Sequence, residues 1–390
     1  MNKPVRAIGL MSGTSMDGID AALIETDGGD HVRRLAALTL SYSDDVRAGL
    51  RAAIEDAKGL RDRASRPGCL ADVERDLTER HVTAVEAVLA AQELAARDID
   101  VIGFHGHTVL HDVVSSENET CTGDTLPVGT AKPSRLTVQI GDGPHLAERT
   151  GIDVVYDLRA ADTAAGGEGA PLAPIYHRAL ANGLPDRPVA FLNLGGVANL
   201  TWIGARGELI AFDTGPGNAM IDDWVSRNAA KSHDEGGRLA AAGRVDGHAL
   251  GRLLDNHYFA VLPPKSLDRN DFSPIPVAHL SPSDGAATLT AFTSRAVALA
   301  RQHLPAPAKL WVVCGGGRHN RTLMSGLAEW MDAPVAPAEA LGFDGDSVEA
   351  EAFAYLAVRS LRGLAITFPG TTGAPGPLSA GLLAHARRDA

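Results

Sequence analysis

A pattern that occurs twice constrains the fold of this chain most strongly. Residues 6–40 read as a strand, a Gly-rich turn and two further strands, and residues 189–213 repeat this order without repeating the letters. The first turn, residues 13–18, lies between the apolar runs 7–11 and 21–24. Apolar runs separated by Gly, Ser and Asp are typical of β-hairpins. The repetition predicts two domains of similar construction, each beginning with a β-meander.

The remainder of the chain alternates strands with helices. At 390 residues the chain is longer than one ordinary hydrophobic core requires. Further strands are expected at 99–104, 136–140, 152–156 and 310–314, and later helices near 219–228, 247–258, 284–303, 320–331 and 346–362. This order predicts two α/β domains, residues 1–187 and 188–390. We expect a two-domain actin-like ATPase (ribonuclease H-like) fold, in which Gly-rich turns from both domains face a central cleft.

Composition limits the classes of partner. The chain carries 36 Lys and Arg against 48 Asp and Glu, a net charge of −12. That balance argues against nucleic acid or an anionic membrane as the main partner. Cys69, Cys121 and Cys314 have no paired spacing, so neither a disulfide framework nor a zinc ribbon is predicted. No signal-type segment and no apolar run of membrane-spanning length is evident, so we expect a cytoplasmic enzyme, with a homodimer left open.

Residues 12–18 have the composition of a phosphate-binding loop. Glycines let backbone N–H groups approach a ligand, and hydroxyl groups add further donors. The predicted donors are Ser12, Gly13, Thr14, Ser15 and Gly18. Asp17 adds a carboxylate of the kind that holds Mg²⁺ or its waters. We therefore expect ATP and Mg²⁺ to bind here, with a hairpin that holds no ligand as the alternative.

Two later Gly-rich turns extend the predicted nucleotide site. Gly195 and Gly196 follow a strand and would form a second phosphate turn. Gly315 and Gly316 also follow a buried strand, but they lack the G-x-G-x-x-G spacing of a dinucleotide fold, which favours purine binding in the actin-like manner. Asp213 ends a strand just before another Gly-rich turn. It could face the site or cap the turn that follows.

The motifs together resemble those of anhydro-N-acetylmuramic acid kinases. The matching stretches are 11–20, 105–108, 137–141, 164–172, 212–218, 264–266, 314–317 and 349–353. The resemblance implies an ATP-dependent sugar kinase that phosphorylates O6 of 1,6-anhydro-N-acetylmuramic acid while water opens the anhydro bridge at C1. The products would be N-acetylmuramic acid 6-phosphate and ADP, in the recycling of peptidoglycan (murein).

The resemblance also implies roles for single residues. Asp213 matches the general base that takes a proton from water at the anomeric carbon. The implied sugar contacts are His105, Thr108, Arg159, Asp162 and Glu349. For Glu349 the alternative is an acid that meets the dipole of the last helix, and for the His105 loop it is a zinc site, which lacks a fourth ligand at a usual spacing.

The sequence departs from the family pattern at several positions. His107 and Glu168 stand where the commonest form has Gln, and Ala160 and Ala161 replace arginines that would suit the lactyl carboxylate of a muramic acid. Arg159 remains for that role. The excursion at residues 112–134 has no counterpart in shorter members. The rival hypotheses are a non-catalytic actin-like regulatory protein, which would not need an acid at 213, and a kinase of a different anhydrosugar.

Overall fold

The computed structural model describes residues 3–13, 15–114, 134–267 and 271–387. Thr14 and Cys121 lie outside the described residues. The expected excursion at 112–134 also lies outside them, except at its ends, where two strands extend into it. The chain divides into two compact units, Met1–Ala173 with Glu349–Ala390, and Pro174–Val348.

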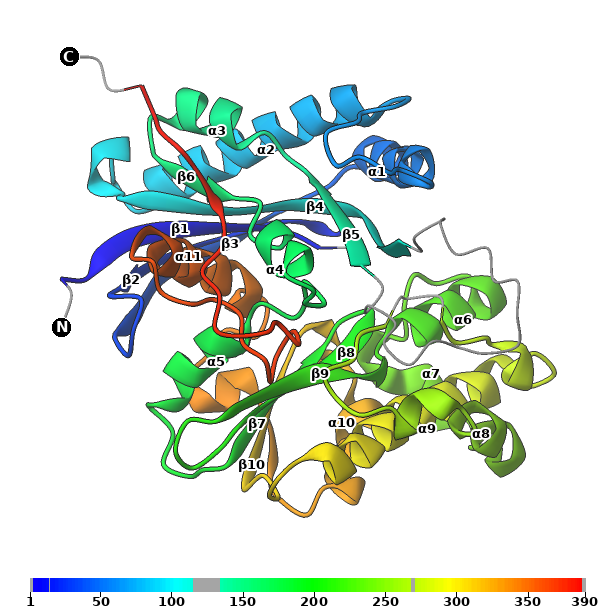
Figure 1. Ribbon diagram of the computed structural model, residues 1–390. Coiled ribbons are helices and arrows are strands. Elements are labelled where there is room, and N and C mark those ends of the chain that lie inside the picture. Colours follow the sequence, from blue (N-terminus) through cyan, green and yellow to red (C-terminus); the bar gives the residue numbers. More distant parts are fainter. Residues whose placement is uncertain (1–2, 14, 115–133, 268–270, 388–390) are drawn as a thin grey trace, which may run out of the picture. The chain divides into compact units, whose positions relative to one another are not determined.

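The first unit is built on a sheet with helices on both faces (Figure 1). Its strands are β1 (Val5–Ser12), β2 (Gly18–Thr26), β3 (Val32–Ser41), β4 (Val101–Val114), β5 (Ser134–Ile140), β6 (Val154–Tyr156) and β12 (Leu382–Ala384). The order is β12-β6-β4-β1-β2-β3, and β5 pairs with β4. Strands β1, β2 and β3 form the expected antiparallel meander, whereas β4 runs parallel to β1 and to β6.

Alternation along β1 directs its side chains to the two faces of this sheet. Ile8 and Leu10 point to the core under the helices α1 (Asp44–Ala57), α2 (Leu70–Ala91) and α3 (Gly143–Thr150). The other face carries α11 (Val348–Leu361), and α4 (Ala160–Ala164) is the remaining helix of the unit. In α2 the expected apolar face is confirmed, and His81 is buried on it with Nδ1 2.8 Å from the Leu77 carbonyl oxygen.

Helix α11 packs on the sheet with almost no space between the two backbones. A Cβ on Gly9 would overlap the Ala350 carbonyl group, and one on Gly103 would overlap the Phe353 carbonyl group. The compact units differ from the expected domains 1–187 and 188–390 at two places. Residues 174–187 belong to the second unit, and the contact of α11 explains the other difference. Residues after 348 lie against the sheet of the first unit, although the sequence analysis assigned them to the second domain.

The second unit repeats the plan. Its strands are β7 (Val189–Leu194), β8 (Val197–Ile203), β9 (Leu209–Pro216), β10 (Leu310–Cys314) and β11 (Val335–Pro337), in the order β11-β10-β7-β8-β9. Its helices are α5 (Pro174–Ala181), α6 (Ala219–Ala229), α7 (Arg238–Ala242), α8 (Gly247–Leu254), α9 (Pro282–Ala300) and α10 (Arg321–Trp330). The expected helix at 247–258 ends early, because Asn256 caps a separate 3₁₀ turn at His257–Ala260.

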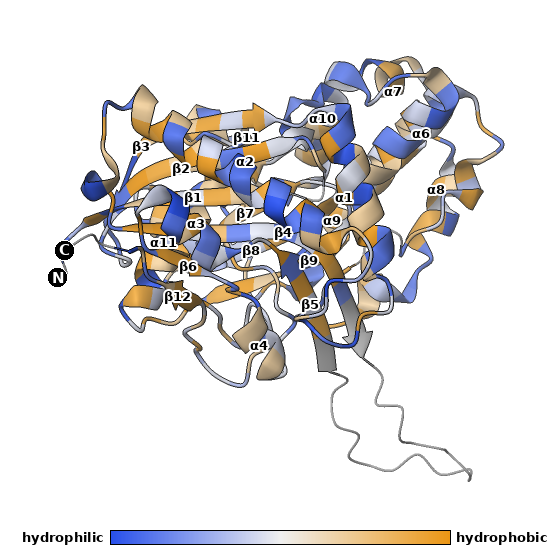
Figure 2. Ribbon diagram, turned by 90° about the horizontal axis from the view of Figure 1, so that it is seen from above, coloured by the Kyte–Doolittle hydropathy of each residue, from blue (hydrophilic) through white to orange (hydrophobic). Residues whose placement is uncertain are grey.

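Apolar packing accounts for the layers of the second unit. Helices α9 and α10 bury Val297, Leu323 and Leu327 against one face of the sheet. On the opposite face, His177 of α5 stacks on Phe191 of β7 with ring centroids 4.8 Å apart. Figure 2 shows how hydropathy is distributed over the elements: in the first unit, strands such as β2 and β6 are mainly apolar, whereas helix α3 carries hydrophilic residues.

The two sheets have the same topology. The order β6-β4-β1-β2-β3 in the first corresponds to β11-β10-β7-β8-β9 in the second, with an antiparallel meander followed by parallel pairs in each. This confirms the repetition seen at residues 6–40 and 189–213, and it is the ribonuclease H-like arrangement of the actin-like ATPases. The cleft expected between the domains stays a prediction. None of the helices in the described ranges combines the length and apolar character that a membrane crossing requires.

The contact between α11 and β1 can be tested by adding one methyl group. We expect Gly9→Ala to lower the free energy of unfolding of the first unit by about 3 kcal/mol or more, because the new Cβ overlaps backbone atoms that cannot rotate away. Gly251→Ala is the matched control, since Gly251 lies inside α8 with open space around it and should stabilise that helix by about 0.5–1 kcal/mol. Thermal unfolding of both variants measures the difference; equal midpoints would contradict the packing.

Candidate functional site

In both units the predicted site residues gather where parallel strands end. In the first unit, the carboxyl ends of β1 and β6 lie beside the middle of β4, because Ser12 pairs with His107 and Tyr156 pairs with Phe104, while β4 continues to Val114. Ligands of open α/β sheets bind outside this edge, where turns present backbone N–H groups and polar side chains. The topology therefore brings together the first turn, the His105 segment and the loop that begins at Asp157.

The first turn connects β1 to β2, with Ser12 opposite Ile19. Within it, the Met16 N–H donates to the Gly13 carbonyl oxygen at 3.0 Å. The predicted ligands Ser15 and Asp17 are exposed to solvent, whereas Thr14 lies outside the described residues. Gly18 is required for packing, since a Cβ there would overlap the Leu40 carbonyl group of β3. The exposed part of this turn is thus the part that can meet a ligand.

Ser12 is tied into a buried polar network beneath the turn. Its Oγ lies 2.7 Å from the Tyr42 hydroxyl and 2.9 Å from Nδ1 of His107. Burial lowers the pKa of His107 to about 4 and raises that of Tyr42 to about 12, so both groups are neutral at pH 7. The network supports the turn from inside, and a contact from Ser12 to phosphate stays a prediction. Tyr42 lies outside the motifs, so sequence reasoning did not identify it.

Hydrogen bonds join His105, in the middle of β4, to Arg159, which follows β6. Nδ1 of His105 lies 2.9 Å from the Gly106 carbonyl oxygen, so this nitrogen carries the proton and Nε2 accepts from Arg159 at 3.2 Å. Burial first, and the positive charge of Arg159 second, lower the pKa of His105 well below its usual range. Arg159 also donates to the Gly169 carbonyl oxygen at 2.8 Å. These bonds anchor a cation at the sheet edge.

Glu349 begins α11 beside this cation. Packing around the carboxyl raises the pKa of Glu349, the charge of Arg159 lowers it, and the charge of Asp20 raises it. The Glu349 side chain is nevertheless exposed to solvent. The structure therefore brings three of the implied sugar contacts, His105, Arg159 and Glu349, into one cluster of the first unit.

The two remaining predicted sugar contacts have internal partners. Asp162 is fully buried, and its two carboxylate oxygens accept from the Gly169 N–H at 2.7 Å and from the Thr372 hydroxyl at 2.6 Å. It shapes the Gly-rich loop, where a Cβ on Gly167 would overlap its carboxylate. Thr108 is half-buried on β4, with its hydroxyl 3.5 Å from the Gln139 amide nitrogen. Their contacts to a sugar stay predictions.

The second unit places its two Gly-rich turns together. Strands β7 and β10 are parallel, and Asn193 pairs with Cys314, so the turns at Gly195–Gly196 and Gly315–Gly316 leave the sheet side by side. Gly315 has a φ of 74° and no room for a Cβ next to Asn193, so this backbone shape requires glycine. The Gly315 N–H is bonded internally, to the Gly345 carbonyl oxygen at 3.1 Å, and nucleotide binding by the two turns stays a prediction.

An ion-pair network around the buried Arg318, which sequence reasoning missed, holds the Gly315 turn. The guanidinium of Arg318 donates to the Gly315 carbonyl oxygen at 3.0 Å, to Glu339 at 2.8 Å and to both carboxylate oxygens of Asp346 at 2.7 and 2.6 Å. Only 3% of the Arg318 side chain is exposed. Hydrogen bonding to Arg318 lowers the pKa of Asp346 despite its partial burial. A planar bidentate pair of this kind gives the turn a fixed geometry.

Asp213 lies at the same edge of the second sheet. Strand β9 runs in the direction of β7, because both are antiparallel to β8, and Asp213 stands next to the bulge where β9 ends. Its carboxylate oxygen Oδ2 accepts the Leu267 N–H at 2.8 Å. Its backbone N–H donates to the Lys265 carbonyl oxygen at 3.1 Å, and its carbonyl oxygen accepts the Tyr258 hydroxyl at 2.6 Å. The half-buried carboxylate is thus held in one orientation.

The arrangement of His, Cys, Asp and Glu side chains limits which metal ions the protein can bind. In the described ranges, no group of three or more His, Cys, Asp and Glu side chains could hold a metal ion. Mg²⁺ needs no such group, since it usually binds one or two carboxylates together with phosphate oxygens and waters. The exposed carboxylate of Asp17, on a turn suited to phosphates, fits this mode.

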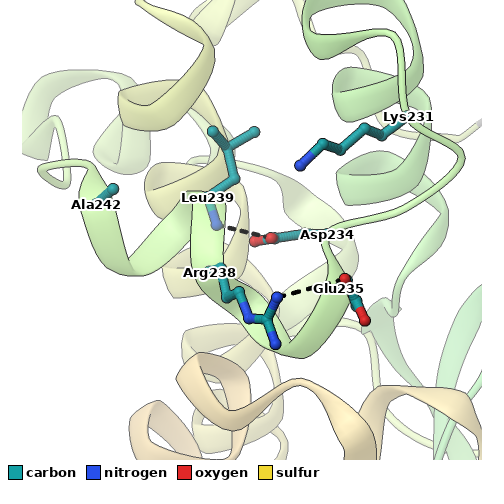
Figure 3. A pocket seen from close by; sticks show the side chains of 6 residues that line it. All are labelled: Lys231, Asp234, Glu235, Arg238, Leu239 and Ala242. Carbon is teal, nitrogen blue, oxygen red and sulfur yellow. Dashed lines mark hydrogen bonds and ion pairs between the residues drawn. The ribbon is translucent and has the colours of Figure 1, made fainter.

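A pocket of about 220 Å³ lies elsewhere on the second unit, beside α7 (Figure 3). It is lined by Lys231, Asp234, Glu235, Arg238, Leu239 and Ala242. Both of its acids have partners: the Asp234 carboxylate accepts the Leu239 N–H at 2.7 Å and the Ala240 N–H at 2.9 Å, and Glu235 pairs with Arg238 at 3.5 Å. None of the predicted site residues lines this pocket.

The chain is similar to known proteins in sequence and, more distantly, in structure. Residues 5–386 match the family model of anhydro-N-acetylmuramic acid kinase. A protein of that name from Rhizorhabdus wittichii is 54% identical, over 96% of this chain and 98% of its own length. Another from Agrobacterium fabrum is 48% identical, over 99% and 100%. Among solved structures, component A of (R)-2-hydroxyglutaryl-CoA dehydratase from Acidaminococcus fermentans is 10% identical with a TM-score of 0.48, over 92% of this chain and 99% of that one.

The buried His107 predicts a pH dependence of stability. With a pKa of about 4 in the folded state and about 6.5 when unfolded, the histidine binds one more proton in the unfolded state between these values. The contribution of the neutral His107 to the free energy of unfolding is complete above pH 6.5 and is lost as the pH falls toward 4. We expect His107→Gln to reduce the slope of the free energy of unfolding against pH by about 1.4 kcal/mol per pH unit.

Urea unfolding at a series of pH values tests this. Between pH 7.5 and 8.5 the two proteins should show the same slope, which serves as the internal control. An unchanged slope between pH 4.5 and 6 would contradict a buried, neutral His107.

Proposed function

Because the chain belongs to the anhydro-N-acetylmuramic acid kinase family, we propose that it transfers the γ-phosphoryl group of ATP to O6 of 1,6-anhydro-N-acetylmuramic acid while water opens the anhydro ring. The products are N-acetylmuramic acid 6-phosphate and ADP, and the step belongs to peptidoglycan recycling. A requirement for Mg²⁺ and a cytoplasmic location are parts of the proposal. A homodimer stays open.

The observation that carries the proposed mechanism is the placement of Asp213. Its carboxylate lies at the sheet edge that also bears both Gly-rich turns of the second unit, and it accepts the Leu267 N–H at 2.8 Å. A hydrogen bond of this kind favours the ionised form, which is the form that can accept a proton. Asp213 is therefore the group of the second unit best suited to activate water.

The reaction then balances in the following way. Asp213 takes one proton from water as the water oxygen bonds to C1, and the bond between C1 and the bridging oxygen breaks. The freed O6 forms a bond to the γ-phosphorus, whose bond to the β-bridging oxygen breaks to release ADP. One proton per turnover passes from Asp213 to solvent. Positioning and charge neutralisation supply most of the catalysis of such a phosphoryl transfer.

The first unit would supply sugar and phosphate contacts. We assign the lactyl carboxylate to the Arg159 guanidinium, which His105 and the Gly169 carbonyl oxygen anchor, and sugar hydroxyls to Glu349. Arg159 would thereby take the role of the arginines that the family pattern has where this chain has Ala160 and Ala161. The turn at residues 13–18 would hold the phosphates, and Asp17 would hold Mg²⁺. The ion would neutralise the negative charge of the phosphates.

Isotope labelling tests the coupled reaction. In water enriched in ¹⁸O, the product of anhydro-N-acetylmuramic acid and ATP should gain one phosphate and one labelled oxygen, because the hydroxyl on C1 comes from solvent. Mass spectrometry reads both changes at once. A phosphorylated product that keeps the anhydro ring would refute the coupled mechanism. Nucleotide binding without turnover on any anhydrosugar would favour the regulatory rival, and turnover of another anhydrosugar alone would change the substrate.

A single substitution tests the base. Asp213→Asn keeps the shape of the side chain but cannot accept a proton, so we expect kcat to fall by about 10²–10⁴-fold while the Kd for ATP stays within about twofold. Asp255→Asn, at an exposed acid of the same unit, is the control and should match the wild type. Near-normal turnover of Asp213→Asn would show that another group is the base.

A further inference from the structure

Lys265 is a buried lysine to which the proposed mechanism gives no role. It is 7% exposed, and no carboxylate among the described residues forms an ion pair with it. Burial lowers its pKa to about 8. Removing an ammonium group from water without a counter-ion costs free energy, and an apolar side chain of similar volume would avoid that cost. A lysine at such a position therefore indicates a function other than stability.

The ammonium group of Lys265 contacts residues that bind Asp213 or stand next to it in the sequence. Nζ donates to the Tyr258 carbonyl oxygen at 2.9 Å and lies 4.4 Å from the centroid of the Tyr258 ring. It also lies 5.7 Å from the centroid of the Phe212 ring, next to Asp213 in sequence. The ammonium group of Lys265 thus holds residue 265 close to Tyr258 by a hydrogen bond and by attraction to aromatic faces. These two residues lie near the ends of one loop segment, residues 258–267.

Both ends of that segment hold Asp213. At one end, the Tyr258 hydroxyl donates to the Asp213 carbonyl oxygen at 2.6 Å. At the other end, the Lys265 carbonyl oxygen accepts the Asp213 N–H at 3.1 Å, and the Leu267 N–H reaches the Asp213 carboxylate at 2.8 Å. Main chain and side chain of the acid are therefore oriented by a loop whose two ends the ammonium ties together.

We propose that Lys265 is the positioning residue of Asp213. By clamping the segment from Tyr258 to Leu267, its ammonium keeps the Leu267 N–H on the carboxylate and the Tyr258 hydroxyl on the main chain. Lys265 itself does not touch the reacting atoms. This role rests on the proposed function, in which Asp213 activates water. It predicts that loss of the ammonium impairs the chemical step and leaves nucleotide binding intact.

Lys265→Met is the direct test, because it removes the charge and keeps an unbranched apolar side chain. We expect kcat to fall by about 10- to 100-fold, as for a catalytic group displaced by about 1 Å, with the KM for ATP within about twofold of the wild type. The thermal midpoint should change by no more than a few degrees, because the cost of burying the charge is removed together with its hydrogen bond. Lys231→Met, at an exposed lysine of the same unit, is the matched control.

A second variant keeps the test decisive if Lys265→Met fails to fold. Tyr258→Phe leaves the ammonium and the ring in place and removes only the hydroxyl that binds the Asp213 carbonyl group. We expect it to lower kcat as well, and we expect the double variant to lose less than the product of the two single losses, since both act through one loop.

Three outcomes would overturn the inference. Normal kcat in Lys265→Met or in a folded Tyr258→Phe would show that the loop does not position the base. A large loss of ATP affinity would make the ammonium a phosphate ligand. Independent, multiplicative losses would separate the two residues. Failure of the proposed function is distinguishable, because Asp213→Asn would then stay active whatever Lys265→Met does.

Discussion

The first unit depends on the contact between the backbone of α11 and the strands β1 and β4. Gly9 and Gly103 leave no room for a Cβ against Ala350 and Phe353, so the helix lies directly on the sheet. A further bond holds the middle of the helix, where the Tyr355 hydroxyl donates to the Gly29 carbonyl oxygen at 2.8 Å. The same contact carries Glu349 from the end of the chain to the strand edge that bears Arg159. A helix held by larger side chains would place that carboxylate several ångströms away.

The polar networks at the strand edges have a common physical character. Neutral histidines, a buried ammonium and a buried guanidinium occupy positions that apolar residues could fill more favourably. Each network fixes one loop: His107 the first turn, Arg318 the Gly315 turn, and Lys265 the segment around Asp213. Because a phosphoryl-transfer enzyme depends mainly on positioning, rigid loops are worth the stability that such groups cost.

The repeated topology explains why the two units can take different tasks on one plan. In both sheets the meander and the parallel strands direct turns to the carboxyl edge, outside which ligands of such sheets bind. The first unit adds an anchored cation and a carboxylate to that edge, and the second adds two adjacent Gly-rich turns and an oriented acid. The difference lies in loops, which can change without disturbing the sheets.

The sequence by itself determined the repeated meander, the strands that end in Gly-rich turns and the family, because apolar periodicity, glycine and motif order are local properties of the letters. Asp213 could be singled out for the same reason. Only the tertiary structure decided that α11 belongs with the first sheet, that Asp162 is a buried support of its loop, and that Tyr42, Arg318 and Lys265 hold the turns. Those roles depend on contacts between residues far apart in the chain, and a single sequence contains no signal for which distant backbone groups will meet.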